Sequence, residues 1–309
     1  MSELTVRLID GGVVVLDGAI STEIQSRGVA LDKLSWASRA TLDHPDVVRE
    51  MHADYIRAGA DVITANTYGA GHTVLRAAGM TAEEADALNR RSVELALEAR
   101  DLVAAERQIW VAGSISSKRP SNSGNVTPTG PEAAAGFHRQ GEILAQAGVD
   151  LVITEMMIDI PNATIVTEAA LATGLPVWHG FSAELSEDGL SAVEWRDGFF
   201  VHPREPFDDL VATITGMGGE AAGVMHSYTR ATTLALEVVR AHWSGPLLAY
   251  AETGRLHYPD WVFDDTASPD EFAVQAKLWA ASGVQIIGGC CGTNPEHIRK
   301  LRETLLPPG

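Results

Sequence analysis

Eight short apolar runs alternate with helical stretches along the chain. The runs are rich in β-branched residues, which is typical of strands buried on both faces of a sheet. They are Val13–Gly18, Val62–Tyr68, Ile109–Ile115, Leu151–Met156, Val177–Ser182, Gly223–Tyr228, Leu247–Thr253 and Val284–Gly289. Amphipathic stretches lie between them, most clearly Pro45–Ala58 and Ala82–Ala104. The pattern therefore predicts strands that alternate with helices.

A repeated joint indicates how these elements connect. The segment Ala58–Thr64 is echoed by Ala147–Thr154 and, more loosely, by Ala281–Ile287. In each segment a helical pattern ends at a glycine suited to a left-handed C-cap, and an apolar run follows at once. A helix that feeds a buried strand in this way is the joint of a βαβ unit.

Eight such units favour a closed α/β barrel, the single (β/α)8 or TIM type, over an open doubly wound sheet. The open alternative is weakened because no G-x-G-x-x-G follows the first run. We expect residues 1–309 to form one barrel domain. Two long polar connections, Ser116–Pro131 and Ala183–Pro206, follow strands and therefore belong to the C-terminal face, where barrel active sites lie. Each is either an ordinary surface loop or a lid over the site.

Composition and charge narrow the class of protein. Of the 309 residues, 45% are hydrophobic, which is typical of a globular chain, and the formal net charge is -18. We expect no nucleic-acid partner, because a chain with this much negative charge repels the phosphate backbone. We also expect no membrane attachment, because no apolar run approaches the roughly 20 residues that span a bilayer. The segment Met1–Gly12 lacks a basic-then-apolar signal pattern, so a cytoplasmic location is expected. The oligomeric state cannot be read from the sequence.

The two cysteines, Cys290 and Cys291, are adjacent and follow the last apolar run. A disulfide between neighbours is strained, so these thiols are inert, reactive or metal ligands. Two adjacent side chains of a regular strand point to opposite faces, and the surrounding glycines would let the backbone leave the strand there. A helix is expected to start at Pro295. The positive N-terminal end of that helix would favour thiolates. Spacing alone leaves a metal site and buried inert cysteines both open.

The string Gly-Gly-Cys-Cys-Gly-Thr-Asn-Pro-Glu-His-Ile-Arg, residues 288–299, resembles the C-terminal zinc motif of the homocysteine S-methyltransferases, which include betaine- and S-methylmethionine-dependent enzymes. Asp17-Gly18-Ala19, His52 to Tyr68, Gly113-Ser114-Ile115 and Thr154-Glu155 are similar to earlier motifs of the same family. The likeness covers nearly the whole chain. It implies a (β/α)8 barrel that binds Zn²⁺ and transfers a methyl group from a sulfonium or quaternary ammonium donor to a small thiol such as homocysteine.

The resemblance also implies a set of site residues. Asp17 and Glu155 would hold the ammonium group of the acceptor, with simple structural caps as the alternative. Trp36 and Tyr68 would form an aromatic cage for a methylated cation, although a packed core tryptophan is equally compatible with the sequence. Gly18, Asn66 and Thr67 would contact substrate. His52, inside a helix, is expected to be structural.

Two positions depart from the family pattern. His226 stands where the family has its first zinc cysteine, which predicts a metal site of His226, Cys290 and Cys291 with one open position. The alternative is a histidine bonded to backbone at the barrel rim. Glu252 stands where an asparagine is usual, so it would hold an ammonium group of the substrate, orient His226, or form a surface salt bridge.

Two other functions compete with a thiol methyltransferase. A metal-dependent barrel hydrolase usually carries His-x-His after its first strand, whereas this chain has Asp17-Gly18-Ala19. A non-catalytic zinc- or thiol-binding relative stays open because of the substitutions at positions 226 and 252. The sequence names neither the methyl donor nor the acceptor thiol.

Overall fold

The computed structural model describes residues 2–32, 34–104, 107–117, 130–186, 189–192, 194–196, 199–201, 206–257, 262–264 and 266–307. Its strands are β1 (Val14–Val15), β2 (Val62–Thr64), β3 (Trp110–Ser116), β4 (Leu151–Met157), β5 (Val177–Phe181), β6 (Ala183–Ser186), β7 (Gly189–Ala192), β8 (Glu194–Arg196), β9 (Phe199–Val201), β10 (Ala221–Tyr228), β11 (Leu247–Glu252), β12 (Arg255–His257), β13 (Val262–Asp264) and β14 (Val284–Gly289). Its helices are α1 (Glu3–Ile9), α2 (Ser21–Ser26), α3 (Ala40–Asp43), α4 (Pro45–Ala58), α5 (His72–Ala77), α6 (Ala82–Val103), α7 (Pro131–Ala147), α8 (Ile160–Leu171), α9 (Phe207–Thr215), α10 (Thr229–His242), α11 (Pro269–Ala281) and α12 (Pro295–Leu305).

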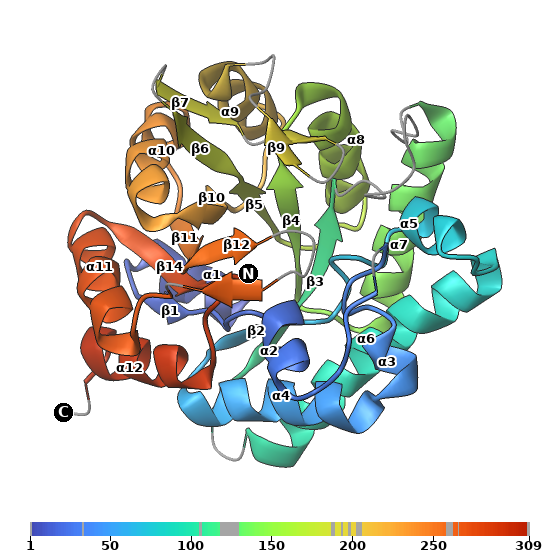
Figure 1. Cartoon of the computed structure of the whole chain (residues 1–309). Helices are drawn as coiled ribbons and strands as arrows, with labels where there is room; N and C mark the ends of the chain where they lie inside the picture. Colours follow the sequence, from blue (N-terminus) through green and yellow to red (C-terminus); the bar gives the residue numbers. More distant parts are fainter. Residues whose placement is uncertain are drawn as a thin grey trace.

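Eight parallel strands form a ring that helices surround (Figure 1). The order around the ring is β1-β14-β11-β10-β5-β4-β3-β2, and a parallel bridge between Leu16 and Val62 joins its two ends. This is a (β/α)8 barrel, so the predicted fold class is confirmed. All eight expected strands are present. β1 and β2 are shorter than their apolar runs, although the Asp17 and Ala65 amides still donate to Val62 O and Ala112 O of the neighbouring segments.

The barrel strands are buried on both faces, one toward the barrel interior and one toward the surrounding helices. Inward-facing residues such as Trp110, Ile153 and Ile286 fill the barrel, and Leu4 and Leu8 of α1 pack against them from below. Outward-facing residues of the strands pack against the helices in a second, larger cluster. Because both faces are buried, the strands carry continuous apolar runs rather than an alternating pattern.

A buried carboxylate ties the lower end of the barrel together. Asp61 accepts a hydrogen bond from the Val15 amide at 3.0 Å and from Arg302 of α12 at 2.8 Å. Arg7 of α1 donates to it at 3.2 Å. One carboxylate thus joins β1, α1 and α12 at the end of the barrel opposite the strand C-termini, where a stabilising role is expected.

Short antiparallel hairpins, rather than plain loops, follow several strands. β6 pairs with β7, β8 with β9, and β12 with β13. The predicted polar connection Ala183–Pro206 therefore contains two antiparallel strand pairs among its described residues. Most of the other connection, Ser116–Pro131, lies outside the described residues.

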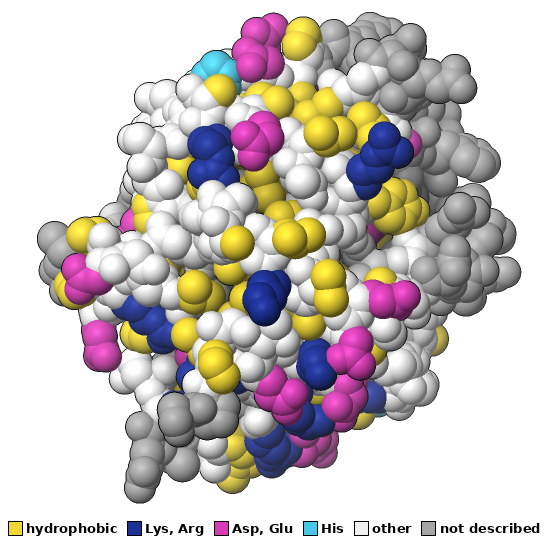
Figure 2. Space-filling model, turned by 90° about the vertical axis from the view of Figure 1, so that its left-hand side faces the viewer, with side chains coloured by type: hydrophobic (Ala, Val, Ile, Leu, Met, Phe, Trp, Pro, Cys, Tyr) yellow, Lys and Arg dark blue, Asp and Glu magenta, His cyan; other side chains and the backbone are white. Residues whose placement is uncertain are grey.

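The outer helices present a mixed surface. Figure 2 shows hydrophobic side chains between separate basic and acidic ones on the side where α10 and α11 lie. Leu234, Val274 and Leu278 are among the exposed apolar residues. Among the described helices, none combines the length and the apolar character needed to cross a bilayer.

Candidate functional site

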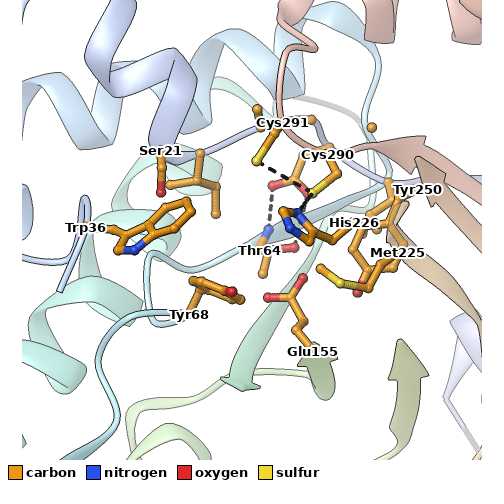
Figure 3. A pocket seen from close by; sticks show the side chains of 16 residues that line it. Ser21, Trp36, Thr64, Tyr68, Glu155, Met225, His226, Tyr250, Cys290 and Cys291 are labelled. Atoms are coloured by element: carbon orange, nitrogen blue, oxygen red, sulfur yellow. Dashed lines mark hydrogen bonds between the residues drawn. The ribbon is translucent and has the colours of Figure 1, made fainter. Parts of the chain in front are cut away.

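A pocket opens where the C-terminal ends of the strands meet, in the middle of the barrel mouth. Figure 3 shows its labelled side chains, with Trp36 and Tyr68 across the cavity from His226, Cys290 and Cys291. The residues that line it are Leu16, Asp17, Gly18, Ala19, Ile20, Ser21, Trp36, Thr64, Tyr68, Glu155, Met225, His226, Tyr250, Gly289, Cys290 and Cys291. Segments from both ends of the chain thus contribute to one site.

Three of these side chains are spaced as metal ligands. The Nδ1 atom of His226 lies 3.9 Å from Cys290 Sγ, and the two sulfur atoms lie 4.0 Å apart. One ligand atom from each residue lies within 4.8 Å of the other two. Tetrahedral zinc with bonds of about 2.0–2.3 Å holds its ligand atoms roughly 3.3–3.8 Å apart. The three residues therefore fit a metal ion after their ligand atoms close in by up to about 1 Å.

The backbone after β14 allows adjacent cysteines to face one point. The Cys290 amide donates to Ala251 O at 2.9 Å, and the Thr253 amide donates to Cys291 O at 2.9 Å. Gly292 then takes a φ of +82°, and a Cβ at this position would lie 2.2 Å from Thr253 O. Only glycine fits there, since it tolerates both the left-handed backbone and the close approach. The glycine makes the departure from the strand possible, as the sequence predicts.

His226 is turned into the mouth by an irregularity of β10. Its φ is 41°, which is unusual for a residue other than glycine. The register with β11 shifts between Met225 and Tyr228, so a bulge carries the histidine out of the regular ladder. Strained backbone of this kind tends to cluster at functional sites. The rim alternative, in which the ring bonds only to backbone, does not match this position, because the ring faces Cys290.

Glu252 lies against His226 rather than in the pocket. Its Oε2 atom is 3.3 Å from His226 Nδ1, and Glu252 is 9% exposed. Burial alone would lower the pKa of His226, but Glu252 and Cys290 more than offset this and raise it to about 9. Burial raises the pKa of Glu252, and His226 acts against that shift. Of the three sequence-based roles for Glu252, contact with His226 is the one that the geometry matches.

The Cys290 thiol favours its protonated form in the protein alone. The hydrogen bond to Cys291, followed by burial, raises the pKa of Cys290 well above its usual value, and His226 opposes this only in part. The expectation that the following helix favours thiolates therefore does not hold for Cys290, because its neighbours outweigh the helix end. A bound cation is what would make a thiolate stable here.

Two buried carboxyl groups face the cavity beside this cluster. The Thr64 amide donates to Asp17 Oδ2 at 2.7 Å, and its hydroxyl donates to Oδ1 at 3.1 Å. Burial raises the pKa of Asp17 to about 8, and Glu155 adds to the shift. Burial also raises the pKa of Glu155, although the Ser114 hydroxyl donates to it. Carboxyl groups shifted in this way would ionise readily if a cation entered the pocket.

Trp36 and Tyr68 form an aromatic wall on the other side of the cavity (Figure 3). Their ring centroids lie 6.0 Å apart with an interplanar angle of 64°, an edge-to-face pair. Trp36 has a φ of 54°, and its backbone bridges to Asp32. Since Trp36 lines the pocket, it is not simply a packed core side chain.

Not every predicted substrate contact reaches the cavity. Asn66 is 3% exposed, and its amide donates to Ala37 O at 2.8 Å. Thr67 donates its hydroxyl to Ser114 O at 2.9 Å. Neither residue is among those that line this pocket, because their polar groups join the rim to neighbouring segments. Gly18 lines the pocket, and its contact with substrate stays a prediction.

His52 is fully buried inside α4 and away from the pocket, in agreement with its expected structural place. Burial lowers its pKa to about 3, so it stays neutral.

A family model gives the clearest comparison with known proteins. The model described as homocysteine S-methyltransferase matches residues 14–305. The chain belongs to the homocysteine S-methyltransferase family. The predicted resemblance is thus confirmed, and it extends over nearly the whole barrel.

Relatives and solved structures of this family agree. The homocysteine S-methyltransferase of Escherichia coli is 31% identical, with 94% of each chain covered. The selenocysteine methyltransferase of Astragalus bisulcatus is 28% identical over 96% of this chain and 93% of its own. The crystal structure of the metallated form of the homocysteine methyltransferase MmuM from Escherichia coli matches with a TM-score of 0.75 at 28% identity, covering 97% of this chain and 99% of that one.

Several residues that shape this site are not among those predicted from the sequence. Thr64 holds Asp17, Ser114 holds Glu155, and Met225 and Tyr250 line the cavity. All four lie within predicted strands, and of these only Ser114 is near the end of its run. The sequence alone offers little signal for them, because which side chain of a strand turns inward depends on the register.

Proposed function

We propose that this chain is a zinc-dependent thiol S-methyltransferase that works as one barrel domain over residues 1–309. The donor is a sulfonium or quaternary ammonium compound, such as S-methylmethionine or betaine, and the acceptor is a small amino-acid thiol such as homocysteine. Both are small molecules. The observation that carries the proposal is the cluster of His226, Cys290 and Cys291 at the mouth of a barrel of this family.

The metal in this proposal is zinc. Nitrogen and sulfur ligands are those that zinc favours, and three protein ligands leave one position for a substrate atom. Bound zinc supplies the positive charge that lowers the pKa of an acceptor thiol. His226 and the two cysteines would hold the ion, and all three side chains line the cavity (Figure 3).

Asp17 and Glu155 bind the acceptor through its ammonium group. Both are buried at the pocket, and burial raises the pKa of each carboxyl group, which favours the neutral form when no cation is present. An ammonium group placed between them would restore that charge and orient the acceptor sulfur toward the metal ligands. A thiol without an amino group should therefore bind more weakly.

Trp36 and Tyr68 bind the methylated cation of the donor. An aromatic face attracts a cation that carries methyl groups, worth about 0.5–2 kcal/mol depending on exposure to water. Their position across the cavity from the metal ligands leaves the transferred methyl group between donor and acceptor. In the reaction the acceptor sulfur bonds to the methyl carbon as the carbon–sulfur or carbon–nitrogen bond of the donor breaks. The electron pair of that bond leaves with the neutral thioether or amine, and the proton of the acceptor thiol is released to solvent.

The test is a panel of donors against a panel of thiols. Purified zinc-loaded protein is mixed with S-methylmethionine, betaine or S-adenosylmethionine, together with homocysteine, cysteine or selenocysteine, and the methylated product is detected by mass. We expect product with at least one pair and about one zinc ion per chain. His226→Ala and Cys290→Ala should lose zinc and activity, whereas His242→Ala, a histidine outside the site, should keep both. A wild-type protein that binds zinc but methylates no thiol would indicate a non-catalytic relative.

A further inference from the structure

Glu252 does not line the substrate pocket, although it ends β11 beside residues that do. Its Oε2 atom lies 3.3 Å from Nδ1 of His226, the same ring nitrogen that faces Cys290 at 3.9 Å. β10 and β11 are neighbouring strands, and their register pairs Tyr228 with Glu252 after the bulge that contains His226. The carboxylate and the imidazole are therefore held together by the same strand pair.

The surroundings of Glu252 leave the imidazole as its main partner. Within the residues that the structure describes, no lysine or arginine forms an ion pair with it, and Glu184 only repels it. A carboxylate that is 9% exposed is unfavourable unless a charged or hydrogen-bonding group compensates it. A surface salt bridge, one of the roles open from the sequence, does not describe this environment.

Glu252 is also outside the group of ligand atoms. The cluster whose ligand atoms lie within 4.8 Å of one another contains His226, Cys290 and Cys291, and Glu252 is not a member. The carboxylate therefore touches the metal site through the histidine. A carboxylate orients a ligating imidazole and increases its basicity when it bonds the ring nitrogen that does not hold the metal. With Glu252 on Nδ1, the ligand atom of His226 in this arrangement would be Nε2.

Charge counting gives the carboxylate a second role. A divalent ion with two thiolates and one neutral imidazole has no net charge. The buried carboxylate next to the ring gives the whole group one net negative charge, which keeps the cysteine and acceptor sulfurs electron-rich. The same carboxylate next to a third thiolate would instead add to an existing negative charge and repel it.

We propose that Glu252 is a positioning residue for His226, which holds the imidazole toward Cys290 and supplies the negative charge that a neutral ligand lacks. This inference rests on the zinc site proposed above. It predicts that the effect of removing the carboxylate depends on which side chain occupies position 226.

The test is a double-mutant cycle on zinc affinity, measured by competition with a chromogenic chelator. In the wild-type background, Glu252→Gln keeps the size of the side chain but removes its charge, and we expect zinc to bind about 10- to 100-fold more weakly. In a His226→Cys background the same substitution should leave zinc affinity unchanged or increase it, since it removes a repulsive charge. Glu184→Gln is the matched control, because it removes a nearby carboxylate that does not touch His226, and it should leave zinc affinity within about twofold.

A second readout does not depend on activity or on affinity. Cobalt substituted for zinc should give a visible spectrum that shifts on Glu252→Gln, because the imidazole is no longer held in place, and that stays unchanged on Glu184→Gln. Circular dichroism verifies that each variant is folded. Equal zinc affinity in wild type and Glu252→Gln, or an equal loss in both backgrounds, would overturn this inference while leaving the zinc site intact. A wild-type protein that binds no zinc would overturn the proposed function as well.

Discussion

Asp17 offers the sharpest test of how the site is charged. Its carboxyl group is 2% exposed, and burial raises its pKa from 3.8 to about 8. The native protein at pH 7 then keeps a proton on Asp17 that the unfolded chain loses. A folded pKa above the unfolded one means that stability is lost as the pH rises from about 4 to about 8. Each pH unit in that window lowers the free energy of unfolding by up to about 1.4 kcal/mol.

The substitution that tests this is Asp17→Asn. An asparagine is close in shape to the protonated carboxyl, and its oxygen can still accept the Thr64 amide, which bonds Asp17 at 2.7 Å. At pH 7 the proton uptake by Asp17 costs at most about 4 kcal/mol, and relaxation around the group reduces this figure. We therefore expect the free energy of unfolding of Asp17→Asn to exceed that of the wild type by about 1–4 kcal/mol at pH 7 and to equal it near pH 4.

The assay is urea unfolding of the zinc-free protein between pH 4 and 9, with the variant and wild type side by side. Asp150→Asn is a suitable control, since Asp150 also accepts a strand amide, from Val111 at 2.7 Å, but lies at the exposed end of the barrel. The same Asp17→Asn variant should bind homocysteine about tenfold or more weakly, because the ammonium group loses a buried countercharge. If the variant is less stable than wild type with an unchanged pH slope, Asp17 is ionised in the native state and the reasoning fails.

Three further predictions concern the other parts of the barrel. Gly292→Ala should lower stability by about 1–3 kcal/mol and speed the loss of zinc to a chelator, because its φ is +82° and the new Cβ would lie 2.2 Å from Thr253 O. Trp36→Leu should raise the KM for the methylated donor about 3- to 30-fold with zinc content unchanged, and a similar loss for an uncharged donor analogue would speak against a cation contact. Asp61→Ala should lower the urea-unfolding free energy by about 2 kcal/mol or more, because Arg302 and its neighbours lose their shared carboxylate, while activity per folded molecule stays the same.

The sequence by itself determined the barrel and the location of its site. Eight apolar runs joined by helices that end at glycine leave few other folds, because each run must be buried on both faces. The candidate metal site could also be recognised from a short stretch of sequence. Its two adjacent cysteines, the flanking glycines and the start of the next helix all lie within about ten residues. Such features are readable because the chemistry that produces them acts over short stretches of chain.

Only the tertiary structure decided which side chains meet. Asn66 and Thr67 carry polar groups at the rim as expected, yet they bond to Ala37 O and Ser114 O, partners that are distant in the sequence. His226 and Glu252 lie on separate strands. Their 3.3 Å contact depends on a bulge in β10 that the local sequence pattern does not predict. In a strand, one residue of register exchanges the two faces, so the partners of a side chain follow from the packing of the whole barrel.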